Sequence, residues 1–268
     1  MRGLAERAYF LVCLWIGGLI RSGRYSRVRI VSHGGERYVR KERLFYAPLM
    51  VWSSGPVFAA LNTGVRVLCR RDWEERERNL YRTLRRAPIR IDAGGALILP
   101  LVPGETLGTL LRDPKLEESV RRRAIELAVL ALVELHRSGI THADAMADNV
   151  LVDLGGGAGH WIDFETIHDP TRPIAWRRAD DVRALLATSL PHTAPEKLGS
   201  TLDLILDSYS DDQVTGLVAA HFTTALRRSL AFHLGQGPMS ERLFREVGRL
   251  LAKRCGLSAG PTAGPKPA

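Results

Sequence analysis

Residues 140–166 read ITHADAMADNVLVDLGGGAGHWIDFET, and this stretch decides how the rest of the chain is interpreted. Its polar residues stand in the order His142-x-Asp144-x4-Asn149, and Asp163 follows Asn149 by fourteen positions. Carboxylate and side-chain amide oxygens are ligands that magnesium ions prefer. A His-x-Asp-x4-Asn pattern also arises from average residue usage in about one chain in a hundred of this length. The pattern alone therefore leaves open that these are loop residues which only cap local structure.

The residues around this pattern predict a β-hairpin. Residues 150–152 form a short apolar run, and residues 161–164 are interpreted as the returning strand. The turn between them contains four glycines, Gly155, Gly156, Gly157 and Gly159. Two apolar runs joined by such a turn are typical of a hairpin. It would bring Asn149 and Asp163 side by side.

The stretch resembles the catalytic core of the protein-kinase-like fold, an α+β bilobal fold with a small β-rich N-lobe and a larger helical C-lobe. The resemblance implies ATP and Mg²⁺ as cofactors, with Asn149 and Asp163 as metal ligands. Asp144 would orient the acceptor hydroxyl and accept its proton. His142 would support the loop structurally, without a part in the chemistry.

Two strands are expected over residues 25–31 and 36–41, because the Ser-His-Gly-Gly between them is a hairpin signal. The second ends in Tyr-Val-Arg-Lys, which resembles the kinase strand whose lysine contacts the phosphates of ATP. The resemblance assigns this catalytic and cofactor-binding role to Lys41. Gly18 and Gly23 are candidates for a phosphate-covering loop, although their spacing departs from the kinase G-x-G-x-x-G.

An apolar insertion over residues 44–67 precedes a strongly charged helix expected at 72–86. In kinases a glutamate on this helix pairs with the strand lysine. Glu77 fits best, because Leu80 and Leu84 follow at i+3 and i+7 and keep it beside the buried face. Glu74 is the alternative, and a solvated charged helix without such a pair remains a further interpretation.

Residues 96–102 form an apolar run before Pro-Gly, which resembles the strand and hinge that line the adenine pocket. The resemblance implies that Leu99, Leu101 and Val102 contact the nucleotide. It also places the lobe boundary near residue 101. The expected divisions are an apolar and basic helix over 1–24, the N-lobe over 25–101, the C-lobe over 102–255 and a disordered tail over 256–268.

Residues 119–137 carry a broad apolar stripe followed by glycine, which predicts a long helix that leads to the catalytic loop. A second helical pattern begins at Asp180 and resembles the kinase helix whose first aspartate braces this loop. We assign that role to Asp181, with Asp180 as the alternative. Further helices are expected over 202–230 and 240–251.

The formal net charge of +9 favours an anionic partner. No zinc-finger, helix-turn-helix or RNP pattern is present, so nucleic acid is not expected as a partner. Three cysteines without C-x-x-C spacing argue against disulfides and zinc and favour a cytoplasmic protein. Residues 8–20 are apolar and flanked by arginines, but thirteen helical residues span only about 20 Å. They predict a helix packed on the small lobe, or a peripheral contact with the anionic inner face of the membrane.

Over residues 25–190 the chain resembles bacterial lipopolysaccharide kinases that phosphorylate Kdo or heptose, and more distantly aminoglycoside phosphotransferases. The insertion after Lys41, the Asp-Phe-Glu that begins at Asp163 and the short segment after it favour that branch. Ala143 and Ala145 depart from it, because the family more often has Gly and Leu there. The resemblance implies an ATP-dependent kinase that acts on a sugar or glycolipid hydroxyl. A Ser/Thr protein kinase and a catalytically inactive kinase-fold binding protein remain alternatives.

Overall fold

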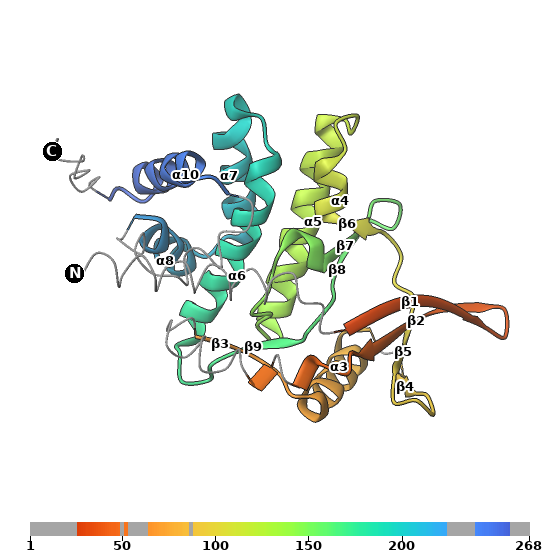
Figure 1. Cartoon of the computed structure of the whole chain (residues 1–268). Coiled ribbons are helices and arrows are strands. Elements are labelled where there is room, and N and C mark those ends of the chain that lie inside the picture. The colour runs from red at the N-terminus through yellow and green to blue at the C-terminus, as the bar shows by residue number, and fades with distance from the viewer. Residues whose placement is uncertain (1–25, 49–50, 53–63, 86–87, 224–238, 258–268) are drawn as a thin grey trace, which may run out of the picture.

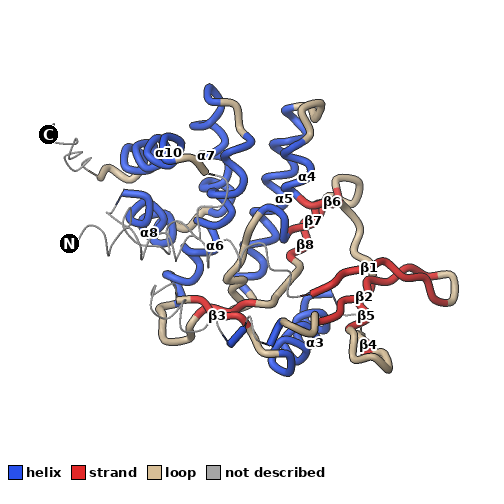
Figure 2. Tube along the Cα trace, in the orientation of Figure 1, coloured by secondary structure: helices blue, strands red, loops and turns tan. Residues whose placement is uncertain are grey.

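A computed structural model describes residues 26–48, 51–52, 64–85, 88–223 and 239–257. The expected helix over 1–24, most of the apolar insertion and the tail from residue 258 lie outside the described residues. The described part combines helices with three small antiparallel sheets, in agreement with the expected α+β class (Figures 1 and 2). Within these described ranges, no helix is both long and apolar enough to span a bilayer.

The first sheet has the strand order β1-β2-β5-β4, and its members are β1 (Ser26–His33), β2 (Glu36–Arg43), β5 (Leu97–Pro100) and β4 (Arg90–Ile91). Gly34 and Gly35 form the turn between β1 and β2 with φ of 60° and 84°. Two successive positive φ angles match the twist of a tight hairpin and favour glycine. The two predicted strands are confirmed, and β2 runs two residues beyond Lys41.

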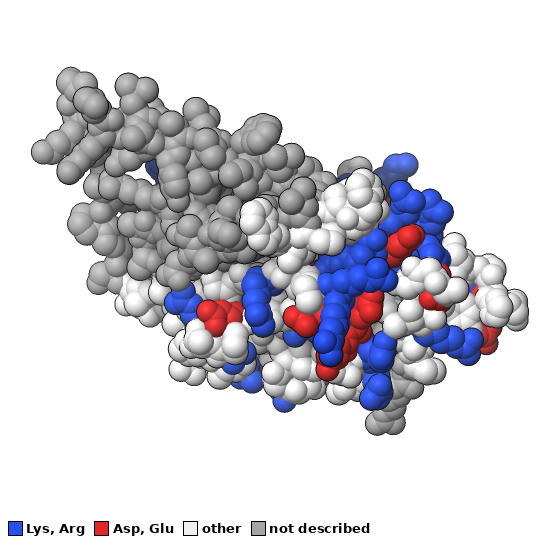
Figure 3. Space-filling view, turned by 60° about the horizontal axis from the view of Figure 1, so that its bottom comes forward, with Lys and Arg blue, Asp and Glu red and all other residues white. Residues whose placement is uncertain are grey.

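Helix α3 (Arg70–Arg85) packs against this sheet. The buried side chains between them form an apolar cluster of Leu68, Trp73, Tyr81, Leu97 and Leu99. The opposite side of α3 is exposed and charged, and Figure 3 shows Lys and Arg lying among Asp and Glu on this face of the molecule. The helix predicted at 72–86 is therefore confirmed, with its start two residues earlier.

A second sheet joins two segments that are far apart in the sequence. Strand β3 (Val65–Val67), just before α3, pairs with β9 (Thr166–His168), just after the Asp-Phe-Glu triplet. The amide of Leu68 continues the pairing by donating to the carbonyl of Glu165 at 2.8 Å. Helix α3 is thus tied at its start to the end of the catalytic stretch.

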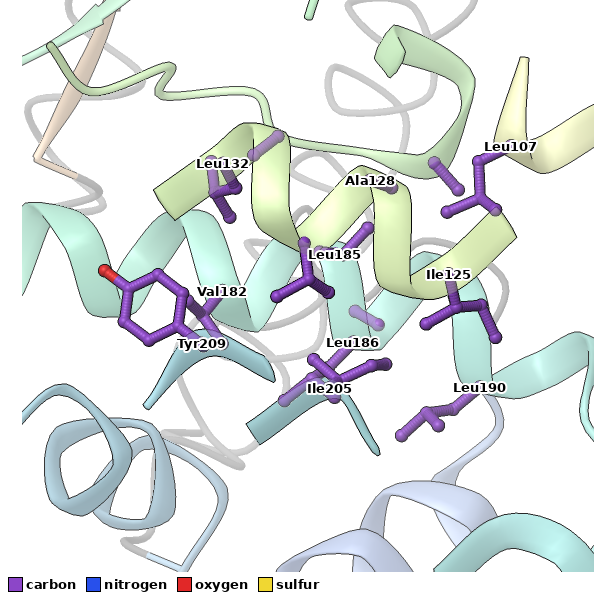
Figure 4. Close-up of a cluster of buried hydrophobic side chains, with 14 of the residues drawn as sticks. Leu107, Ile125, Ala128, Leu132, Val182, Leu185, Leu186, Leu190, Ile205 and Tyr209 are labelled. Carbon is purple, nitrogen blue, oxygen red and sulfur yellow. The ribbon is translucent and has the colours of Figure 1, made fainter. Parts of the chain in front are cut away.

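Most of the apolar core lies among the helices that follow β5. They are α4 (Leu107–Arg112), α5 (Glu118–Arg137), α6 (Ile174–Ser189), α7 (Leu198–Tyr209), α8 (Asp212–Thr223) and α10 (Glu241–Arg254). Figure 4 shows Ile125, Ala128 and Leu132 of α5 facing Leu185 and Leu186 of α6. The predicted helix at 119–137 is confirmed, and its apolar stripe fills this core.

The third sheet contains the predicted hairpin, with the strand order β6-β7-β8. Its strands are β6 (Glu105–Thr106), β7 (Val150–Asp153) and β8 (Ala158–Trp161). The returning strand was expected at 161–164, which is wrong, because β8 ends at Trp161. Asp163 has φ of 66°, and an extended strand cannot continue through that conformation.

One continuous helix was expected over 202–230, but the structure has two helices there, because α7 ends at Tyr209 and α8 begins at Asp212. Ser210 ends α7 with φ of 54°, and Asp211 Oδ1 accepts a hydrogen bond from the amide of Val214 at 3.0 Å. An aspartate that satisfies free amides at a helix start begins a new helix instead of prolonging the old one. Residues 224–230 lie outside the described part.

We expect Gly104→Ala to destabilise the protein. Gly104 has φ of 106°, and a Cβ there would lie 2.5 Å from the carbonyl oxygen of Val152. The free energy of unfolding should fall by about 2 kcal/mol or more, because both the conformation and the close approach are incompatible with alanine. Urea unfolding measures this. Gly216→Ala in α8 is the control, since its Cβ meets open space and alanine favours helix by about 1 kcal/mol. Equal effects of the two substitutions would contradict the described contact.

Candidate active site

Lys41 is the centre of a cluster of charged side chains drawn from three separate segments. Its Nζ lies 2.8 Å from Glu77 Oε1, 2.7 Å from Asp163 Oδ1 and 3.3 Å from Glu165 Oε1. Lys41 and Glu77 are buried, whereas 43% of the Asp163 side chain is exposed. Asp163 is therefore the member of this cluster that faces solvent.

Burial alone would lower the pKa of Lys41. The negative charges of Asp163, Glu77 and Glu165 more than offset this and raise the pKa of Lys41 well above its ordinary value. Burial likewise opposes ionisation of Asp163, but the charge of Lys41 lowers its pKa. The structure thus holds a buried ammonium next to a carboxylate that solvent can reach.

Glu77 and Glu74 have different surroundings on α3. Glu77 is 1% exposed and points at Lys41. Glu74 instead pairs with Arg70 at 2.7 Å on the outer side of the helix. The geometry favours Glu77 over Glu74 because three residues rotate a helix by most of a turn and change the face that a side chain occupies.

Asp144 and Asn149 are joined directly. Asn149 Nδ2 donates to the main-chain oxygen of Asp144 at 2.8 Å and to its Oδ2 at 2.9 Å. The amide of Ile162 donates to the carbonyl of Asn149 at 2.9 Å, which places Asp163 one residue beyond this link. Burial and the nearby charge of Asp163 raise the pKa of Asp144 to about 7, although the bond from Asn149 opposes the shift.

This raised pKa predicts how stability depends on pH. The folded protein keeps a proton on Asp144 between about pH 4 and pH 7, where the unfolded chain has lost it. The contribution of Asp144 to the free energy of unfolding should therefore fall as pH rises through this window. We expect the free energy of unfolding of Asp144→Asn to fall less steeply with pH than that of the wild type, when urea unfolding is measured between about pH 4 and pH 7 without divalent cations. Parallel profiles for the two proteins would contradict the shift.

Asp181 of α6 holds the loop that carries Asp144. Asp181 accepts hydrogen bonds from the main-chain amides of His142 at 2.8 Å and Ala143 at 2.7 Å. His136 Nε2 also contacts Asp181 Oδ2 at 2.9 Å. Burial opposes ionisation of Asp181, but the hydrogen bond with His136 and the charges of His168, His136 and His142 lower its pKa. Asp180, the alternative, instead contacts His168 at 3.2 Å and Arg183 at 2.8 Å.

His142 is fully buried and does not face the cluster around Lys41. Its Nε2 contacts the carbonyl oxygen of Ile162 at 2.8 Å, and its ring lies 4.6 Å from that of Phe164 and 5.2 Å from that of Trp161. Burial lowers its pKa. This side chain connects the loop to the segment that carries Asp163.

Ala143 adopts φ of 68°, a conformation that suits glycine better than alanine. We expect Ala143→Gly to change the free energy of unfolding by less than about 0.5 kcal/mol, because relief of strain offsets the lost methyl contact. Ala145→Gly is the matched control, since Ala145 is buried but has no positive φ. The free energy of unfolding of Ala145→Gly, measured with urea, should be about 1–2 kcal/mol lower than that of the wild type. A similar loss in both variants would show that Ala143 is not strained.

The three residues expected at an adenine pocket differ in their surroundings. Leu99 is 3% exposed and belongs to the apolar cluster under α3, so its side chain is committed to the core. Leu101 and Val102 follow β5 and are half-buried. Only these last two have side-chain surface left for a ligand. Leu99 differs because it lies within β5 on the same face as the buried Leu97, whereas Leu101 and Val102 lie beyond the end of this strand at Pro100.

Three charged or polar residues of this site were not predicted from the sequence. Glu165 contacts Lys41, Arg43 at 2.9 Å and the hydroxyl of Ser26. The alternation of a strand could have indicated Arg43, because it stands two residues after Lys41 and shares its face. Nothing local in the sequence indicates that Glu165 reaches β1 and β2.

The donor atoms suit Mg²⁺ in type and charge. Asp163 and Asn149 carry the hard oxygens that this ion prefers. Asp144, Asp163 and Glu165 bring several carboxyl groups close together. Burial raises the pKa values of Asp144 and Glu165, and the charge of Asp163 adds to both shifts, so ionising these groups together carries a cost. A cation would relieve that cost. Among the described residues, no group of three or more His, Cys, Asp or Glu side chains is arranged to hold a metal by itself.

Comparison with known proteins gives a partial similarity. No protein-family model matches the chain. A segment of 64 residues, 24% of the chain, is 41% identical to mitogen-activated protein kinase kinase kinase mkh1 of Cytospora mali. A similar match at 39% identity, again over 64 residues, is to the kinase kinase kinase MCK1 of Pyricularia oryzae. The chain spans only 4% of the length of each relative. Over about a quarter of its length, the chain is therefore similar to protein kinases.

Proposed function

We propose that the chain is an ATP- and Mg²⁺-dependent phosphotransferase with a protein-kinase-like bilobal fold, whose lobes meet near residue 101. The observation that carries this proposal is the contact of one buried lysine with two carboxylates from distant segments. Lys41 of β2 meets Glu77 of α3 at 2.8 Å and Asp163 at 2.7 Å. A lysine held by a helix glutamate, beside a carboxylate suited to Mg²⁺, is the arrangement that phosphoryl transfer by kinases requires.

In the proposed reaction the acceptor oxygen forms a bond to the γ-phosphorus of ATP, and the bond to the bridging oxygen of ADP breaks. Asp144 accepts the proton that the acceptor hydroxyl loses, and Asn149 orients Asp144 through its hydrogen bond. Lys41 neutralises phosphate charge. Mg²⁺, held by Asn149 and Asp163, would supply further positive charge at the phosphates.

The adenine group is proposed to lie beside the segment after β5. Leu101 and Val102 are half-buried there and can contact a planar ring. Leu99 would contribute indirectly, because its side chain fills the core behind this segment. The hinge assignment thus rests on two side chains and on the position of β5 next to the strand that carries Lys41.

For the acceptor we propose a sugar or glycolipid hydroxyl, as in the lipopolysaccharide kinases that the sequence resembles. The short link from Phe164 to Asp180 supports this choice, because fifteen residues provide little platform for a polypeptide substrate. The similarity to the two kinase kinase kinases favours the alternative, a Ser/Thr protein kinase. Purified protein should be offered Kdo, heptose and glycolipid acceptors beside generic protein substrates, and a preference for the proteins would overturn the first choice.

We also propose a cytoplasmic location with peripheral contact to an anionic membrane face. The net charge of +9 supports this contact, as do the exposed side chains of Arg27 and Arg29 on β1. Co-sedimentation with vesicles of phosphatidylglycerol and phosphatidylcholine tests the contact. Binding that does not depend on the anionic lipid, or no binding at low salt, would contradict it.

The cofactor assignment is tested by calorimetric titration of ATP with and without Mg²⁺. Asp163→Ala should remove the Mg²⁺-dependent part of ATP affinity, because the variant lacks the solvent-facing carboxylate. Asp148→Ala is the control, since Asp148 lies in the same loop region but pairs with Arg112 at 2.7 Å. Unchanged Mg²⁺ dependence in Asp163→Ala would exclude Asp163 as a ligand.

A further inference from the structure

Glu165 is held in place by its backbone. It follows Asp163 and Phe164 directly, and its carbonyl oxygen accepts from the amide of Leu68 at 2.8 Å. The next residues form β9, which pairs with β3. The backbone of Glu165 is therefore bonded to the segment that leads into α3, and the residue is only 7% exposed.

Its side chain points in the other direction, to the first sheet. Oε2 lies 2.9 Å from Arg43 Nη1, Oε1 accepts from the hydroxyl of Ser26, and Oε1 also lies 3.3 Å from Lys41 Nζ. Ser26 and Arg43 stand opposite each other in the β1–β2 ladder. A single carboxylate thus engages both strands of this hairpin at the end where Lys41 lies.

Arg43 is committed to this contact. Its side chain is 4% exposed, it donates to the carbonyl oxygen of Leu68 at 2.6 Å, and its guanidinium lies 4.9 Å from the ring centroid of Trp73. A buried guanidinium whose carboxylate is removed loses the opposite charge that offsets its desolvation cost. Arg43 and Glu165 are therefore expected to act as a unit.

Among the three carboxylates on Lys41, Glu165 has a distinct position. Asp163 is the solvent-facing one, and under the proposed function it must also serve Mg²⁺. Glu77 holds Lys41 from α3 but does not contact β1 among the described hydrogen bonds. Of these three carboxylates, Glu165 is the one that links Lys41 and Arg43 of β2 and Ser26 of β1 to the segment that carries Asp163.

We propose that Glu165 is a positioning residue that fastens the β1–β2 hairpin to the Asp163 segment and so keeps Lys41 directed at the phosphates of ATP. The part that concerns ATP rests on the proposed function. The fastening itself does not, because it follows from the contacts of Glu165 with Ser26, Lys41 and Arg43. The Asp-Phe-Glu triplet thereby gains a role for its third residue that a glycine cannot fill.

Amide hydrogen exchange of the full chain tests the fastening without reference to activity. Glu165→Gln keeps the size of the side chain and removes its charge, so peptides covering 26–43 and 165–168 should exchange faster. Glu74→Gln removes an exposed ion pair with Arg70 and should leave these peptides at the wild-type rate. Wild-type exchange in Glu165→Gln would overturn the proposal.

Steady-state kinetics tests the positioning. We expect Glu165→Gln to lose about tenfold or more in kcat/KM for ATP with an unchanged KM for the acceptor, because a displaced Lys41 affects the nucleotide alone. Glu165→Asp should recover part of this loss. Arg43→Gln combined with Glu165→Gln should lose less than the product of the single losses, since the two residues act together. The positioning role would be refuted if the loss in kcat/KM of the double variant equalled the product of the two single losses. It would also be refuted if Glu165→Gln exchanged faster but kept wild-type kinetics. A wild type without ATP turnover would refute the proposed function, and exchange would still decide the fastening.

Discussion

Lys41→Met should lower the rate of phosphoryl transfer by about two to three orders of magnitude. The substitution removes a charge-assisted contact to phosphate from a cleft where water screens charges poorly. It also leaves Glu77, Asp163 and Glu165 without their shared cation, and loss of one partner of a buried ion pair costs about 3–5 kcal/mol of stability. Turnover should therefore be measured well below the melting temperature of the variant, which circular dichroism provides.

Arg40→Met is the matched control for Lys41→Met. Arg40 precedes Lys41 in β2 but faces the other way, where it pairs with Glu42 and Asp92, each at 2.7 Å. A shift of one residue along a strand moves the side chain to the opposite face. The control should keep activity near that of the wild type. A silent Lys41→Met together with a damaging Arg40→Met would show that the described register of β2 is wrong.

Asp144→Asn should lower the rate of phosphoryl transfer by about 10²–10⁴ and leave ATP affinity nearly unchanged. The amide preserves the shape of the side chain but cannot accept the proton of the acceptor hydroxyl. Lys41, which is proposed to meet the phosphates of ATP, does not contact Asp144 among the described ion pairs. Single-turnover kinetics and calorimetric ATP titration measure the two effects.

Two outcomes would contradict this role for Asp144. Wild-type turnover in the variant would exclude it as the base, and a large loss of ATP affinity would place it on the nucleotide side. Asn149→Ala offers a comparison, because it removes the bond that orients Asp144 and a proposed metal ligand together. That variant should therefore lose both turnover and Mg²⁺-dependent affinity.

The local parts of the fold could be predicted from the sequence because their signals are local. The glycine turn and apolar runs indicated the β7–β8 hairpin, and the apolar stripe indicated α5. The spacing of Leu80 and Leu84 placed Glu77 on the inner side of α3, where it meets Lys41. Each of these predictions needed only the spacing at which side chains return to the same face of a helix or strand.

The features that were missed depend on contacts between distant segments. The pairing of β3 with β9 joins three-residue strands about a hundred positions apart, too short to carry a period of their own. Glu165 contacts Arg43 across 122 positions of sequence. From the sequence it was used only as the third residue of the Asp-Phe-Glu triplet, and no contact was predicted for it. The left-handed conformations of Asp163 and Ser210 ended elements that the apolar pattern would have continued.

The most direct test of the central claim is transfer of the radiolabelled γ-phosphate of ATP by the purified full chain in the presence of Mg²⁺. Sugar, glycolipid and protein acceptors should be compared, with Asp144→Asn and Asp163→Ala measured in parallel. We expect the wild type to release ADP and label a hydroxyl acceptor, and both variants to do so far more slowly. Wild-type protein that binds ATP yet matches the two variants across all acceptors would show a kinase-fold binding protein without turnover, and would contradict the account.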